Sequence, residues 1–68
     1  MSELIEVCGR ELLPGDVLYS QKKGRPIRMV LSVDRTRNAV TWIWLRSFEI
    51  SELLAWDEEY DIIRSPKQ

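Results

Sequence analysis

Ile27–Leu45 reads IRMVLSVDRTRNAVTWIWL, and this stretch decides the fold of the chain. Apolar and polar residues alternate over 27–34, which is typical of a half-buried strand. Residues 35–38 have the polar side chains of a tight turn, and Asn38 tolerates the left-handed conformation that such a turn needs. Residues 39–45 are rich in β-branched and aromatic side chains and contain no Gly or Pro. The stretch therefore predicts a β-hairpin.

The register of this hairpin decides where Trp42 and Trp44 lie. If Asp34 pairs with Ala39, both rings join the aliphatic face of the first strand and become core residues. A slip of one residue moves both rings to the opposite face, beside Arg28, where they would suit a binding surface. We favour the first register. Its facing pairs are Val33 with Val40, Leu31 with Trp42, and Met29 with Trp44.

Composition excludes several classes of protein. The 68 residues make one small domain, 1–68, which can bury only about 60% of its unfolded surface. There is no histidine, and the single Cys8 is expected to be a buried apolar residue in a reducing compartment. A zinc site is therefore excluded, and no metal or other cofactor is expected. With no apolar stretch of about 18 residues and an acidic N-terminus, we expect a cytoplasmic protein without membrane contact.

The rest of the chain predicts further short segments of structure on both sides of the hairpin. Pro14-Gly15 favours a type II turn that leads into a strand over 17–20. Ser51 is a candidate N-cap for a single helical turn over 51–56, with a longer helix over 49–59 as the rival assignment. The remaining expectations are a strand or an arm within 1–11, a loop over 21–26, short strands over 47–50 and 60–64, and a frayed tail over 65–68.

Three motifs carry a resemblance to a known class of domain. They are Pro14–Val17 (PGDV), Val30–Asp34 (VLSVD) and Val40–Trp44 (VTWIW). They resemble the turn and strands of small SH3-like barrels of the KOW-related kind, over residues from about 12 to 64. The resemblance implies an all-β fold, a five-stranded SH3-like barrel with one short helical turn before the last strand. It also implies a binding role more often than catalysis.

No motif for catalysis is present in the sequence. Without histidine, neither a Ser-His-Asp nor a Cys-His arrangement can form. Lys23-Gly24-Arg25 has one glycine and lacks the spacing of a phosphate-binding loop. The acidic residues of 57–61 lack the spacing and glycine of a calcium loop, and we interpret them as a solvated edge. We therefore expect no enzyme.

Charge is unevenly distributed along the chain, although the net charge is only -1. Residues 22–46 contain seven Lys or Arg and one Asp, whereas 1–21 and 47–68 are both acidic. Such a split suggests a polyanion partner, an acidic protein partner, or contact between opposite faces of two copies. The alternative interpretation is that charges of both signs simply solvate the surface. If the loop 21–26 and the turn 35–38 lie at the same end of the barrel, their cations form one positive patch.

Two functions fit these features. The first is a protein-interaction module, an accessory protein of the kind that phage and plasmid genomes encode, which binds and modulates a larger partner. Trp56 and Tyr60 flank the expected helical turn, and Arg and Trp are favoured interface anchors. Packing offers the other interpretation, with Trp56 as a core plug and Tyr60 as a partly buried ring.

The second function is binding of nucleic acid by the cations of 22–46, with an exposed Trp42 or Trp44 that stacks on bases. The sequence pI of about 5.3 is low for a dedicated nucleic-acid binder. The candidate partner-binding residues are Lys22, Lys23, Arg25, Arg28, Arg35, Arg37, Trp56 and Tyr60.

Overall fold

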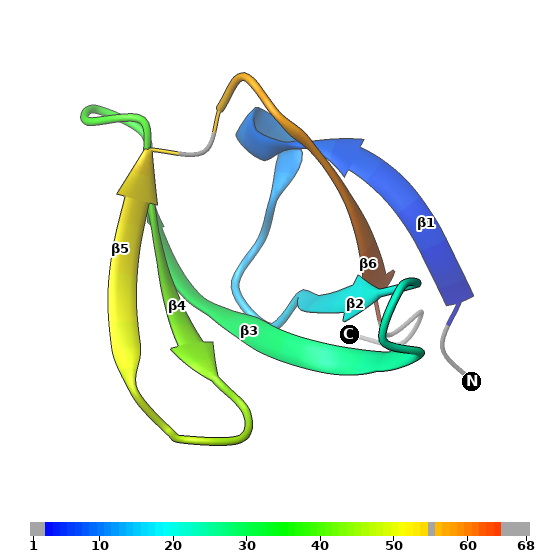
Figure 1. Cartoon of the computed structure of the whole chain (residues 1–68). Coiled ribbons are helices and arrows are strands. Elements are labelled where there is room, and N and C mark those ends of the chain that lie inside the picture. Colours follow the sequence, from blue (N-terminus) through cyan, green and yellow to red (C-terminus); the bar gives the residue numbers. More distant parts are fainter. Residues whose placement is uncertain (1–2, 55, 65–68) are drawn as a thin grey trace.

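The computed structural model describes residues 3–54 and 56–64, and these form an all-β structure (Figure 1). The all-β class is thus as predicted, and the expected tail over 65–68 lies outside the described residues. No helix in the described part is long and apolar enough to cross a membrane. The elements are β1 (Glu3–Cys8), a 3-10 turn η1 (Gly9–Glu11), β2 (Val17–Ser20), β3 (Arg25–Asp34), β4 (Ala39–Trp44), β5 (Ile50–Leu54) and β6 (Glu59–Arg64).

The strands form one antiparallel sheet in the order β1-β6-β2-β3-β4-β5. The sheet curls strongly and does not close, so β1 and β5 are its two edges (Figure 1). The sequence predicted five strands, and the described residues form six. The strand predicted over 47–50 is wrong in its bounds, since the strand in this part of the chain is β5, Ile50–Leu54. Residues 3–8 form a full edge strand along β6 rather than an arm, because Ile5 and Val7 pack against the core side of the sheet.

The β3–β4 hairpin forms with the predicted turn, and Asp34 lies opposite Ala39. Leu31, however, lies in a β-bulge and has no partner in β4. This extra residue in β3 shifts by one every pair between the bulge and the start of β3, so Trp42 lies opposite Val30 instead of Leu31. The predicted aliphatic face is therefore wrong for the first half of β3, where alternation alone could not reveal the bulge.

The bulge combines features of both predicted registers. Trp42 is fully buried, with 0% of its surface exposed, as the favoured register predicted. Trp44 lies opposite Arg28, the neighbour that belonged to the slipped register, and it is only partly buried. The ring of Trp42 packs against Tyr60 from β6, with 5.6 Å between ring centroids. This pair crosses the centre of a core that also contains Val7, Leu12, Leu18, Val30, Val40 and Ile62.

Neither the helical turn predicted over 51–56 nor the rival helix over 49–59 forms in the described residues of these ranges. Residues 50–54 instead form β5, which pairs with β4 over its whole length. The reason is that β4 carries backbone donors and acceptors on both sides, and β5 satisfies the second side. Ser51 and Leu53 lie opposite Trp42 and Val40, so tertiary packing overrides the local helical signal.

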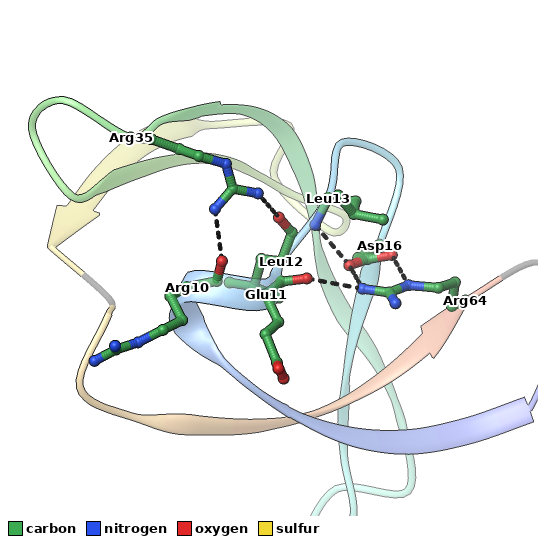
Figure 2. A network of polar contacts seen from close by, with 7 residues as sticks. All are labelled: Arg10, Glu11, Leu12, Leu13, Asp16, Arg35 and Arg64. Atoms are coloured by element: carbon green, nitrogen blue, oxygen red, sulfur yellow. Dashed lines mark hydrogen bonds and ion pairs between the residues drawn. The ribbon is translucent and has the colours of Figure 1, made fainter.

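The predicted type II turn is present before β2. Gly15 has a φ of +95°, which favours glycine, and the Asp16 amide donates to the Leu13 carbonyl oxygen at 3.1 Å. The buried Asp16 carboxylate accepts hydrogen bonds from the Leu13 amide at 2.8 Å and from two nitrogens of Arg64 at 2.8 and 2.7 Å (Figure 2). This contact with Asp16 raises the pKa of Arg64. The turn is therefore fastened to β6 by a charged pair.

Candidate functional site

The predicted basic loop and basic turn lie at opposite ends of β3. Residues 21–24 form the turn before this strand, and residues 35–38 form the turn after it (Figure 1). Consecutive antiparallel strands alternate their turns between the two ends of a sheet, so the condition for one positive patch, a shared end for the loop and the turn, is not met. The two groups have different surroundings.

At the end of β3 that carries residues 35–38, the cations contact groups of the chain itself. The Arg35 guanidinium donates to the carbonyl oxygens of Arg10 at 2.6 Å and Leu12 at 3.4 Å (Figure 2). Arg37 pairs with Glu52 at 2.5 Å and with Asp34 at 3.5 Å. The hydrogen bond with Glu52 raises the pKa of Arg37. These two arginines thus serve the fold.

Trp56 lies at this same end and is partly buried. The guanidinium carbons of Arg35 and Arg10 lie 5.8 and 6.0 Å from the centroid of its ring. A cavity of about 350 Å³ is lined by Arg10, Arg37, Asn38, Leu54, Trp56 and Asp57. The structure therefore brings three predicted residues together here, Arg35, Arg37 and Trp56.

Tyr60 does not belong to the surface, contrary to its place among the predicted partner-binding residues. Only 9% of it is exposed, because its ring packs against Trp42 in the core. Its hydroxyl donates to Glu58 Oε1 at 3.4 Å. Burial, assisted by the charge of Glu58, raises the pKa of the phenol.

At the opposite end of β3, the predicted residues Lys22, Lys23 and Arg25 are exposed. Antiparallel pairing with β4 places the start of β3 beside residues 44–46, and the Leu45 amide donates to the Ile27 carbonyl oxygen at 3.0 Å. A cavity of about 220 Å³ lies here, which we term the basic cavity. It is lined by Lys23, Arg25, Pro26, Ile27, Trp44 and Arg46.

Sequence reasoning missed that Trp44 and Arg46 join Lys23 and Arg25. The signal was available, because a hairpin that begins at Asp34 and Ala39 brings the residues after β4 back to the start of β3. Charge counted along the chain instead groups Lys23 and Arg25 with the turn 35–38.

Trp44 is held in a defined position within the basic cavity. Its indole Nε1 donates to Ser51 Oγ of β5 at 3.1 Å. The Arg28 guanidinium carbon lies 4.9 Å from the Trp44 ring centroid and 4.4 Å from that of Trp42. Burial lowers the pKa of Arg28, and its Nε has no hydrogen-bond partner among the described residues. Arg28 is therefore a support for two rings rather than an exposed contact residue.

A third surface is the open edge of β5, together with the loop before it. Phe48, Ile50 and Leu54 are 72%, 64% and 78% exposed. Phe48 has a φ of +61°, an uncommon conformation for a bulky side chain. Within the described part of the chain, only β4 pairs with β5.

Comparison of the chain with models of known protein families, with curated proteins and with solved structures finds no match. Among the described residues, no group of three or more His, Cys, Asp or Glu side chains is placed to hold a metal ion. The function proposed for the chain therefore depends on its own geometry.

Proposed function

We propose that the chain is a non-enzymatic protein-interaction module that binds an extended segment of a larger protein along β5. The observation that carries this proposal is the open edge of β5, with exposed Phe48, Ile50 and Leu54 beside it. An exposed edge presents unpaired backbone donors and acceptors, to which an extended segment adds as a further strand.

The side chains of β5 suit such an addition. Ile50, Glu52 and Leu54 alternate onto one face of the strand, with Ser51 and Leu53 on the other. Glu52 is the one charged residue of β5, and its carboxylate is paired with Arg37. In most proteins, Lys, Pro or a bulge in an edge strand prevents another strand from pairing with it. β5 contains no Lys or Pro, and it pairs with β4 without a shift in register. The backbone groups at its edge are therefore available to a further strand, and no unpaired charge of β5 opposes such pairing.

The resemblance to SH3-like domains of the KOW-related kind is part of this proposal. It is supported by the Pro14–Asp16 turn and by four consecutive antiparallel strands, β2 to β5. We propose that β1 is an addition to such a domain. In this proposal the chain is a cytoplasmic accessory protein. It modulates its partner by binding one of the partner's extended segments.

The test compares capture of partner proteins by immobilised wild-type chain and by two variants. Ile50→Lys/Leu54→Lys places two charges at the β5 edge, and the matched control Leu13→Lys changes a similarly exposed leucine, 45% exposed, in the turn before β2. We expect the β5 variant to lose a specific partner that the control retains. Hydrogen exchange on the purified complex should show added protection of the amides of residues 50–54.

Equal capture by all three folded proteins would contradict the proposal. So would a complex in which residues 50–54 exchange as fast as in the free chain.

A further inference from the structure

The cations of the basic cavity differ from Arg37, at the other end of β3, in having no acidic partner among the described residues. Arg37 and Arg64 form ion pairs with carboxylates. Lys23, Arg25 and Arg46 form none with the described residues of the chain. Three like charges around one small cavity repel each other, so an anion that enters it lowers the electrostatic energy.

The wall of the basic cavity adds an aromatic surface to this charge. Trp44 is fixed at two points, by the Ser51 hydroxyl and by the Arg28 guanidinium. A ring that is already held loses little conformational entropy when a ligand stacks on it. The cavity of about 220 Å³ is smaller than the roughly 300–1,000 Å³ of pockets that enclose a drug-sized ligand. It therefore suits one planar group of a longer ligand.

We propose that the basic cavity binds single-stranded nucleic acid. One base stacks on the indole of Trp44, and the neighbouring phosphates contact Lys23, Arg25 and Arg46. Stacking on an aromatic ring beside a positively charged groove is the usual way in which proteins bind single strands. This site is separate from the β5 edge, so it goes beyond the proposed protein-interaction function.

The alternative ligand for a basic site is an acidic peptide, and the indole wall favours nucleic acid over it. Carboxylates need only the cations, whereas every nucleobase has a π-face that stacks on Trp44. The duplex is disfavoured for the same reason, because its bases are already stacked on each other and cannot reach the ring. The proposal therefore predicts a preference for single strands over both competitors.

The experiment titrates three labelled probes into the purified full chain at low and at moderate salt. They are a single-stranded oligonucleotide of about 12 nucleotides, a duplex of the same length, and a poly-glutamate peptide of similar charge. Binding is followed by anisotropy of the probe and by tryptophan fluorescence. We expect binding of the single strand with tryptophan quenching, and an affinity that falls with salt by about 0.7 log units per log unit of salt for each phosphate contact.

Matched variants locate the site. Arg25→Gln/Arg46→Gln should weaken single-strand binding at least about tenfold and lower the salt slope, since each lost contact removes about 0.7 from it. Arg37→Gln removes the same kind of charge at the other end of β3 and should leave binding unchanged. Trp44→Phe should abolish most of the quenching, with circular dichroism as the check on folding.

Several results would overturn the proposal. One is the absence of single-strand binding at low salt, and another is equally tight binding of poly-glutamate or duplex. If Arg37→Gln weakened single-strand binding equally, the strand would be attracted by the overall charge of the protein rather than by the basic cavity. Because Arg25 and Arg46 are exposed, their variant remains a valid test even if Trp44→Phe does not fold.

Discussion

Arginines in two regions of this small sheet have different roles. Around the segment 9–16, Arg35 and Arg64 donate to backbone carbonyl oxygens, and Arg64 also binds the buried carboxylate of Asp16 (Figure 2). Around the basic cavity, Arg25 and Arg46 contact no acid of the described chain. Arginine thus fastens the fold in one region and, in the other, has no acidic partner among the described residues.

The difference follows from what the chain places opposite each arginine. The segment 9–16 has little regular structure, so its carbonyl groups lack partners in the sheet and need donors from side chains. Near the basic cavity, β3 and β4 already pair with each other, and their backbone groups need no help from Arg25. We therefore expect changes in the first region to affect stability and changes in the second to affect binding.

The largest effect should come from Trp42, the largest fully buried side chain among the described residues. The Trp42 ring contacts both Tyr60 and the Arg28 guanidinium, so Trp42→Ala removes a buried ring together with both of these contacts. We expect a loss of about 3–5 kcal/mol in the free energy of unfolding, which is most of the stability of so small a domain. Urea denaturation followed by circular dichroism measures this. A folded variant with a loss below about 1 kcal/mol would contradict the assignment of Trp42 as the central core residue.

The next largest effect should come from the charged pair of the first region. Arg64→Gln leaves the buried Asp16 carboxylate without its charged partner, which should cost about 2–4 kcal/mol. The double variant Asp16→Ala/Arg64→Gln should cost much less than the sum of the single changes, because both remove the same interaction. Denaturation of all four proteins measures the coupling. Additive losses would show that the pair does not act as a unit, and the comparison between the two regions would lose its main support.

Much of the fold could be predicted from the sequence, because its signals are local. The turns at Pro14-Gly15 and at residues 35–38, the strands β2 and β6, and the burial of Trp42 all follow from residue type and alternation. The strand β5 could not be predicted in this way. Its residues have a helix-like local pattern, and only the unpaired side of β4 makes them a strand.

The bulge at Leu31 and the candidate site show a second limit. Val30 and Leu31 are adjacent apolar residues, and nothing local says which of them faces inward. The role of an arginine depends on contacts far along the chain, such as the 48 residues that separate Asp16 from Arg64. Counting charges along the sequence therefore found the basic segment but grouped Arg35 and Arg37 with the wrong cations.

Two single substitutions, one in each region, should have smaller and opposite effects on stability and on binding. Arg35→Gln removes a charged donor from two carbonyl oxygens and should cost about 1 kcal/mol of stability, without changing affinity for a single strand. Arg46→Gln should leave stability within about 0.5 kcal/mol of wild type and weaken that affinity. Urea denaturation and oligonucleotide anisotropy on both variants check this. The reverse result, or equal effects of both variants on both measurements, would contradict a structural role for Arg35 and a binding role for Arg46.

The smallest effect at neutral pH concerns Tyr60, whose ring packs against Trp42. Burial, with a contribution from Glu58, raises the pKa of Tyr60 in the folded chain above its ordinary value of about 10. The folded state thus keeps the phenolic proton at a pH where the unfolded state releases it. This contribution to stability is complete below about pH 10 and is lost as the pH rises through the folded pKa. In a Tyr19→Phe background, tyrosinate absorbance reports Tyr60 alone, and we expect its midpoint to lie above the ordinary value of about 10 while circular dichroism shows that the chain stays folded. Ionisation of Tyr60 near pH 10 in a chain that stays folded would mean that the Trp42–Tyr60 contact is open to water.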